Sequence, residues 1–403
     1  MSYADLSGCQ SSSTPETTTA GLNGGELAEA KRYGRRELFC TLADKAIDVV
    51  YLLLFVLFLA RPLESYLQNF SLLKEYVTLR LTALFLVLLL LHLAVSFPLS
   101  YYSGHLLEHQ FKLSTLSFGR WLWRYVKRNL VGGGLMWLMV LALFWLIWTL
   151  GAAWWPVAAV AFFLFAVVLG RLAPVVILPL FYRFEKLNMP ELTARLEQVM
   201  AGTGISLDGV YRIELSTETV KANAMLAGMG RTRRVLLGDT LLRTCTTEEL
   251  EVIFAHEVGH HVFRHISKIM LLGLVCGFIG FWLCDRVLAV WAMWCGEVLD
   301  YAHLSPEALP LLMFVITLLT MIIEPLQNAL SRRFEREADR YALQRTGLFA
   351  AYRSAFYKLA RLNKDDPNPH WLDLLLFHSH PSVAQRLAFA EQAEAETRNR
   401  PLV

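Results

Sequence analysis

Two histidines and a glutamate in this chain have the spacing needed to bind and use a metal ion. The sequence HEVGH occupies residues 256–260 and follows a Thr-x-x-Glu capping box at 246–249, which predicts a helix through the motif. Residues four apart lie on one face of a helix, so the imidazoles of His256 and His260 can share one zinc ion. Glu257 lies on the neighbouring strip and can hold the water that zinc acidifies. The motif alone also occurs by chance, so a third ligand is required.

A carboxylate that could complete this site follows the last apolar run. Residues 331–342 are compatible with a helix throughout. Glu335 would give two histidines and one glutamate with an open fourth position, as in catalytic zinc sites. By spacing alone Glu337 is a competing ligand, and a solvated helix face with salt bridges and no ligand is a third interpretation.

The composition is that of a membrane protein. Of 403 residues, 55% are hydrophobic and 18% charged, and the mean hydropathy is +0.41, whereas soluble domains carry about 25% charged residues. A net charge of +3 is too small to favour nucleic acid, and none is expected as a partner. The six cysteines form no Cys-x-x-Cys pair, which favours reduced packing residues.

Six apolar runs predict membrane-spanning helices. The first is the shortest and reaches spanning length only if it is extended to Leu63, and the fourth is interrupted near Pro174. The runs lie at roughly 46–60, 79–98, 130–150, 154–180, 269–294 and 309–330.

The distribution of Lys and Arg predicts the orientation in the membrane. Basic residues gather before the first span and after the second, whereas the turn at 151–153 and the loop at 296–307 contain none; the 61–80 loop, with three, is intermediate. The positive-inside rule then places both termini and the active site on the cytosolic face. The membrane would be the bacterial inner membrane, or the endoplasmic reticulum in a eukaryote.

The fold class expected is mainly α: a polytopic helical membrane protein with a small α+β cytosolic metalloprotease portion. In the latter we expect a helix over Glu191–Met200, a strand over Val210–Leu215, and a hairpin whose strands flank Gly228-Met229-Gly230. An edge strand beside the metal helix could bind an extended peptide by strand addition. The metal helix is expected to continue towards the fifth span. The expected divisions are 1–40, a disordered tail; 41–181, four membrane helices with a cytosolic loop; 182–267, the catalytic segment; 268–331, two membrane helices; and 332–403, a cytosolic segment with the third ligand.

These motifs together resemble a known family. The integral-membrane zinc metalloproteases that include the CAAX prenyl endoproteases and the HtpX-type proteases combine HExxH with a later S-R-x-x-E-x-x-A-D, here at 331–339. Similarity to the CAAX branch extends to Asn223, to the His-Pro element at 380–381 with Arg386, and to residues 108–111. The chain departs from that branch in having six predicted spans where seven are usual, and Ser382 where a second proline is usual.

The resemblance implies a role for each of these residues. Glu335 would be the third ligand of one Zn²⁺ per chain, and Asp339 would orient a ligand. Glu257 would act as the base, His380 and Arg386 would stabilise the negative carbonyl oxygen, and Asn223 would hold the substrate backbone.

Two further histidines close to the motif are not expected to bind the metal. On one continuous helix His261 points about 100° away from His260, and His265, five residues on, is also rotated off the ligand face.

The function predicted is hydrolysis of peptide bonds, in a peptide or protein substrate at the bilayer. Cleavage near a prenylated C-terminus and degradation of membrane-inserted proteins are both open. The alternative from another class is a non-catalytic scaffold or transporter with a vestigial zinc site.

Overall fold

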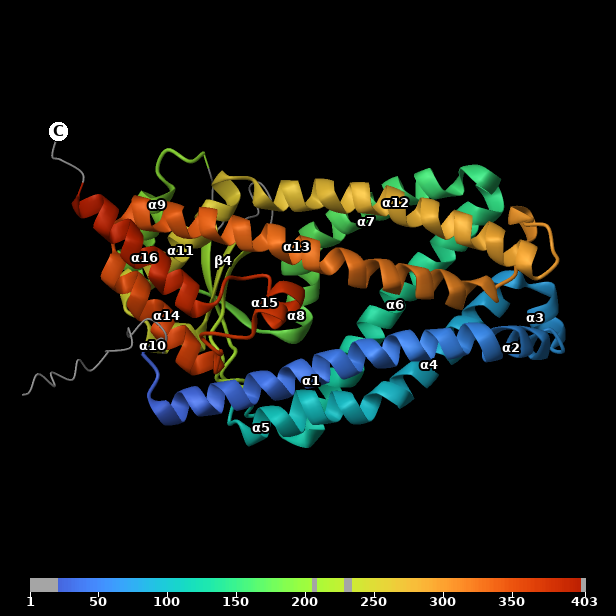
Figure 1. The fold of residues 1–403 in the computed structure, drawn as a ribbon, viewed down its shortest axis with the longest axis horizontal. Coiled ribbons are helices and arrows are strands. Elements are labelled where there is room, and N and C mark those ends of the chain that lie inside the picture. Colours follow the sequence, from blue (N-terminus) through green and yellow to red (C-terminus); the bar gives the residue numbers. More distant parts are fainter. Residues whose placement is uncertain (1–20, 205–208, 228–233, 400–403) are drawn as a thin grey trace, which may run out of the picture.

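Long helices run side by side through most of the molecule, and a small sheet with shorter helices gathers at one end (Figure 1). This computed structural model describes residues 21–204, 209–227 and 234–399. The predicted class, a mainly helical membrane protein with a small α+β portion, is confirmed.

The long helices are apolar enough to cross a membrane. Five segments of the described chain qualify, and the third, Phe118–Phe181, folds back at Gly151 (φ 54°) so that its halves α6 and α7 pack together. With that turn counted, the six predicted spans all correspond to helices. They are α1 (Gly24–Leu54) continuing through η2 (Phe55–Leu59) into α2 (Ala60–Leu67), α4 (Val77–Tyr101), α6 (Phe118–Leu150), α7 (Trp154–Leu172), α12 (His265–Trp294) and α13 (Ala308–Thr346).

Shorter elements connect these spans. As predicted, the fourth span is interrupted at Pro174, which lies in η5. The connecting elements are α3 (Ser71–Glu75), η3 (Tyr102–Leu107), α5 (Glu108–Gln110), η4 (Gly151–Ala153), η5 (Ala173–Ile177), α8 (Leu178–Phe181) and η7 (Tyr301–His303).

The predicted disordered tail over residues 1–40 is wrong for its second half. α1 already begins at Gly24, where the side chains and backbone of Asn23 and Glu26 form a reciprocal capping box. The helix therefore begins well before the apolar run that predicted it. Its first turns are polar and form ion pairs with residues near the C-terminal end of the chain, Glu26 with Arg361 and Glu29 with Lys364. Residues 1–20 lie outside the described part of the chain.

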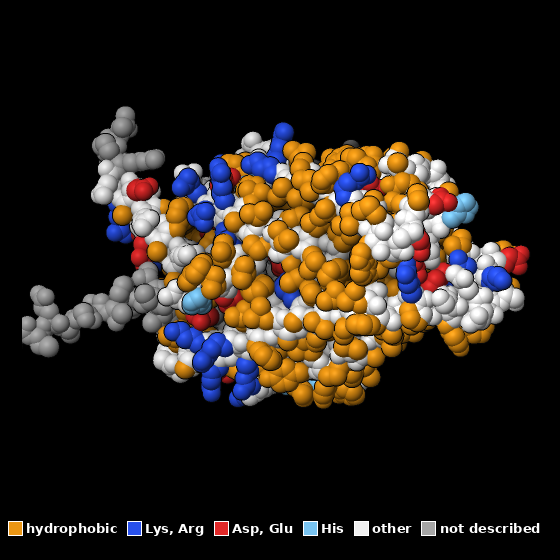
Figure 2. All heavy atoms as spheres, turned by 45° about the vertical axis from the view of Figure 1, so that its right-hand side comes forward, with side chains coloured by type: hydrophobic (Ala, Val, Ile, Leu, Met, Phe, Trp, Pro, Cys, Tyr) orange, Lys and Arg blue, Asp and Glu red, His pale blue; other side chains and the backbone are white. Residues whose placement is uncertain are grey.

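Charge is distributed unevenly between the two ends. A broad band of hydrophobic side chains covers the middle of the face in Figure 2, and Lys and Arg gather at the left-hand end, which carries the catalytic helices. At the opposite end two of the basic residues pair with acids: Arg61 lies 3.4–3.5 Å from Glu307 and Glu297, and Arg80 lies 2.5 Å from Glu64.

Ionisable residues within the apolar helices are mostly paired. His92 Nε2 lies 2.7 Å from Asp48 Oδ1, and Lys45 Nζ lies 2.6 Å from Glu324 Oε2. The fully buried Asp285 accepts hydrogen bonds from Trp154 and Tyr301. Interhelical pairing thus offsets much of the cost of these groups in an apolar environment.

The sheet has the strand order β1-β2-β4-β3, with β2 and β4 parallel and the outer pairs antiparallel. The predicted pairing of 224–227 with the strand that begins at 234 is confirmed, with Ala224 opposite Leu237; the connecting residues 228–233 lie outside the described chain. β3 is therefore an edge strand. The strands are β1 (Phe184–Lys186), β2 (Gly209–Ile213), β3 (Ala224–Ala227) and β4 (Arg234–Gly238).

Helices enclose this sheet and share its hydrophobic core. Buried side chains from α9, α11, α14 and α16 pack with Val210, Val235 and Leu237 of the sheet. The helices of this end are α9 (Pro190–Met200), α10 (Asp239–Thr244), α11 (Thr247–Val262), α14 (Phe349–Asn363), α15 (Trp371–Phe377) and α16 (Val383–Arg398).

The helix that carries His256 and His260, α11, was predicted to continue into the fifth span, and this prediction is wrong. α11 ends at Val262, and Arg264 adopts a left-handed conformation (φ 54°) before α12 starts at His265. Neither Gly nor Pro marks this break, so the sequence pattern did not reveal it. By contrast, the sixth span and residues 331–342 form one helix, α13.

Candidate active site

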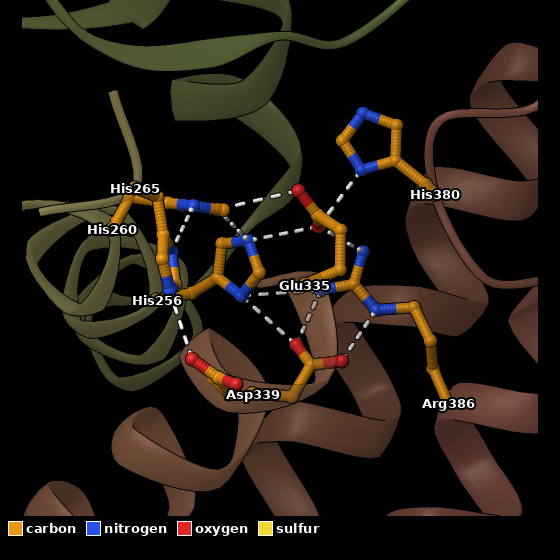
Figure 3. Close-up of polar contacts among 8 residues, drawn as sticks. His256, His260, His265, Glu335, Asp339, His380 and Arg386 are labelled. Carbon is orange, nitrogen blue, oxygen red and sulfur yellow. Dashed lines mark hydrogen bonds and ion pairs between the residues drawn. The ribbon is translucent and has the colours of Figure 1, made fainter. Parts of the chain in front are cut away.

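Three predicted metal ligands converge from two helices. His256 and His260 lie on α11, whose predicted capping box between Thr246 and Glu249 is present, and Glu335 lies on α13. His256 Nε2 is 3.1 Å from His260 Nε2, and each of these atoms is 3.2 Å from an oxygen of Glu335 (Figure 3). In the described part of the chain these three residues form the one group of three or more metal-binding side chains, with ligand atoms within 4.8 Å of one another.

A glycine in the motif lets the two helices approach. A Cβ atom on Gly259 would lie 3.0 Å from Ala338 Cα and 3.3 Å from Tyr341 Cβ. Those contacts are closer than the separation of about 3.5–4.0 Å that carbon atoms prefer. The absence of a side chain at Gly259 therefore allows α11 to pack closely against the part of α13 that carries Ala338 and Tyr341.

Asp339 and Arg386 support His256 from the side opposite the cluster. Asp339 Oδ1 lies 2.9 Å from His256 Nδ1, and Arg386 donates to both oxygens of Asp339. Burial disfavours a charged imidazole, but Asp339 and Glu335 outweigh burial and raise the pKa of His256 to about 9. The two carboxylates therefore favour a positive charge on the His256 ring.

Arg386 also lines the cavity beside the cluster, and its predicted interaction with the carbonyl oxygen of the substrate stays a prediction. Its side chain is buried, is stacked 3.9 Å from the ring centroid of Phe356, and is occupied mainly by Asp339. Burial lowers and the charge of Asp339 raises the pKa of this guanidinium, and the net shift is upward, so it stays charged. Sequence reasoning could not anticipate this pair, because α13 and α16 meet only in the folded chain.

His380 and Glu257 both line a cavity of about 660 Å³ beside the cluster. The His380 side chain is 62% exposed, and its Nδ1 lies 2.8 Å from Glu335 Oε2. Glu257 is half-buried on the wall next to His256. The lining of this cavity also includes Glu37 of α1 and Asp365, for which the sequence predicted no role.

Asn223 immediately precedes the edge strand β3. Its side chain is exposed and lines the same cavity, and its carbonyl oxygen accepts a hydrogen bond from the Gly238 amide, 2.9 Å away.

One residue near the metal cluster was assigned no role from the sequence. His265 is buried, and its Nδ1 lies 3.0 Å from His260 Nδ1. His265 is not among the clustered metal-binding side chains, in line with the prediction that it is no ligand. Its contact with His260 was not predicted, because a rotation of 100° per residue holds only along an unbroken helix and the helix is broken at Arg264.

Comparison with known proteins agrees with this geometry. The model of peptidase family M48 matches residues 186–394, which is just over half of the chain and contains the whole cluster. The chain belongs to peptidase family M48. A second family model, described as CAAX prenyl protease N-terminal with five membrane helices, matches residues 6–183.

Curated relatives in this family are similar over most of the chain. A Bacillus subtilis protein called uncharacterized metalloprotease YhfN is 28% identical over 371 residues, covering 92% of this chain and 86% of the relative. CAAX prenyl protease 1 of Saccharomyces cerevisiae is 26% identical over 324 residues, covering 76% of this chain and 70% of the relative. The crystal structure of S. mikatae Ste24p superposes with a TM-score of 0.82 at 21% identity, covering 95% of this chain and 92% of that one, which shows a common fold.

This M48 protein is therefore a multi-pass membrane metalloendopeptidase of the CAAX prenyl protease type. The donors at the cluster fit the metal that the family implies: two imidazole nitrogens and a buried carboxylate bring their ligand atoms within 4.8 Å of one another. Nitrogen and oxygen donors of these kinds are common zinc ligands.

Proposed function

We propose that this M48 peptidase uses one zinc ion, held by His256, His260 and Glu335, to hydrolyse peptide bonds at the cytosolic face of the membrane. The observation that carries the proposal is the convergence of two Nε2 atoms and one carboxylate within 4.8 Å. Two histidines and one glutamate are a ligand set of catalytic rather than structural zinc sites.

Bound zinc would lower the pKa of a water molecule towards about 7 and polarise the substrate carbonyl. Glu257, on the cavity wall beside His256, would accept the proton of the attacking water and pass it to the leaving amine. His380, exposed in the same cavity, would donate to the negative carbonyl oxygen.

The other site residues would position rather than react. Asp339 would hold the His256 ring with Nε2 directed at the metal, and Arg386 would keep Asp339 charged and in place. Asn223 and the edge of β3 would align an extended substrate segment across the cavity.

We place the cavity on the cytosolic side because Lys and Arg gather at the end of the molecule that carries it (Figure 2), and the positive-inside rule assigns the more basic side of a membrane protein to the cytosol. The substrate would be a protein attached to or inserted in the bilayer. Since several relatives are named CAAX prenyl proteases, we propose a segment close to a prenylated C-terminus as the first substrate to test, with an unprenylated membrane-inserted protein as the second arm.

The test is hydrolysis of a quenched peptide by purified protein in detergent, together with zinc content. Wild type should hold about one zinc per chain. Glu257→Gln should keep zinc and lose activity, Glu335→Gln should lose affinity for zinc, and Glu248→Gln, an exposed residue on the same helix, should match wild type. Wild type that binds no zinc and cleaves nothing would favour the scaffold alternative.

A further inference from the structure

His265 connects a metal-ligand candidate to a carboxylate. Its Nδ1 lies 3.0 Å from His260 Nδ1, and its Nε2 lies 3.1 Å from Glu337 Oε2. The ring is 1% exposed and stacks on Phe334, with centroids 4.2 Å apart and planes at 9°. On the outer side, Arg333 Nε lies 3.2 Å from the other oxygen of Glu337.

These contacts determine where the protons lie. The ionised carboxylate of Glu337 can only accept, so His265 Nε2 must donate to it. In a neutral imidazole, Nδ1 of His265 then carries a lone pair and accepts from Nδ1–H of His260. That leaves the lone pair of His260 on Nε2, the atom that faces His256 and Glu335.

We propose that His265 is a positioning residue that fixes His260 as the tautomer able to bind metal, with Glu337 fixing His265 in turn. The inference rests on the proposed zinc site. It gives the second histidine of the motif a support equivalent to the one Asp339 gives His256, through a neutral ring instead of a direct carboxylate.

The break at Arg264 is what makes this support possible. On a continuous helix a side chain five residues after His260 would be rotated by about 140° and could not return to it. The left-handed Arg264 ends the regular rotation of α11, and α12 then begins with the His265 ring stacked on Phe334 of α13. Glu337, the rejected third ligand of the sequence analysis, thereby contributes through His265.

A variant pair separates positioning from packing. His265→Phe keeps a ring that can stack on Phe334 but has no acceptor, whereas His265→Asn places an amide oxygen near the position of Nδ1. With zinc affinity measured by competition with a chelator, we expect His265→Phe to weaken binding about 10–100-fold, with His265→Asn closer to wild type. Glu337→Ala should weaken binding less than His265→Phe, because it frees the His265 tautomer without removing the ring.

The variant Arg336→Ala serves as the control, because Arg336 is exposed and neighbours Glu337 on α13. This variant should bind zinc as wild type does. Wild-type affinity in a folded His265→Phe variant overturns the inference. If His265→Phe does not fold, Glu337→Ala decides, and wild-type zinc affinity in that variant overturns the inference. Glu337 is suited to this test because it is the last and most exposed residue in the series of contacts His260–His265–Glu337. Absence of zinc from wild type itself contradicts the proposed function instead, so the two failures are distinguishable.

Discussion

Replacing Gly259 by alanine tests whether the contact between α11 and α13 sets the metal site. The added methyl group would lie 3.0 Å from Ala338 Cα and 3.4 Å from Ala338 Cβ. Carbon atoms prefer a separation of about 3.5–4.0 Å, so the helices must part by roughly half an ångström. Since Ala338 meets the methyl group with its backbone, no side-chain rotation can relieve the contact.

The expected cost follows from two opposing terms. Overpacking of a well-packed interface costs about 1–3 kcal/mol, and alanine gains about 0.5–1 kcal/mol over glycine inside a helix. The net loss should lie between about 0 and 2.5 kcal/mol, centred on about 1 kcal/mol. Because the same displacement moves His256 and His260 away from Glu335, zinc affinity should fall together with stability.

Thermal unfolding in detergent and chelator competition measure the two effects. Gly134→Ala in α6 is the matched control, because its added methyl group would meet nothing within 4 Å. We expect the control to bind zinc as wild type does and to unfold at the same or a slightly higher temperature, since alanine is favoured over glycine inside a helix, and Gly259→Ala to unfold at lower temperature and bind zinc more weakly. Equal stability and affinity in Gly259→Ala and wild type would refute the reasoning.

Three further outcomes are expected. Asp339→Asn should weaken zinc affinity about 10–100-fold, and an unchanged affinity would contradict the support of His256 by Asp339. The same change leaves the Arg386 charge buried without its partner, so the free energy of unfolding, measured thermally or chemically, should fall by roughly 3–5 kcal/mol. A chelator should abolish hydrolysis reversibly. It should also lower the free energy of unfolding by about 4 kcal/mol relative to protein at a zinc concentration 1,000 times the dissociation constant. Equal stability with and without zinc would count against a metal bound to the folded state. Restricted hydration at the cavity wall, followed by the nearby Glu37 charge, raises the pKa of Asp365 from 3.8 to about 6, although its side chain is exposed to the cavity. The stabilising effect of the protonated carboxyl is complete below the lower pKa and is lost as pH rises through the upper one. Unfolding curves of Asp365→Asn should therefore change less with pH across this window than those of wild type or Asp366→Asn, and parallel curves would contradict this.

The metal motif could be predicted because its determinants are local. A capping box fixes the start of α11, and a spacing of four places His256 and His260 on one face of the helix. Glu335 and Glu337 could not be separated by spacing, because both lie on the same helix and only its packing against α11 decides which one reaches the histidines. The apolar helices followed from hydropathy alone.

What the sequence did not reveal depends on non-local or unmarked features. The left-handed Arg264 has no glycine or proline beside it, so both the end of α11 and the position of His265 were missed. The polar start of α1 carries no apolar signal and gains its order from packing at the catalytic end. The pairing of Arg386 with Asp339 joins residues 47 positions apart.

The most direct test of the account is anomalous diffraction at the zinc edge from crystals of the zinc-loaded Glu257→Gln variant. We predict one peak about 2.0–2.2 Å from Nε2 of His256, Nε2 of His260 and an oxygen of Glu335. A peak coordinated by Glu337 instead, or zinc-containing crystals with no peak between α11 and α13, would contradict it.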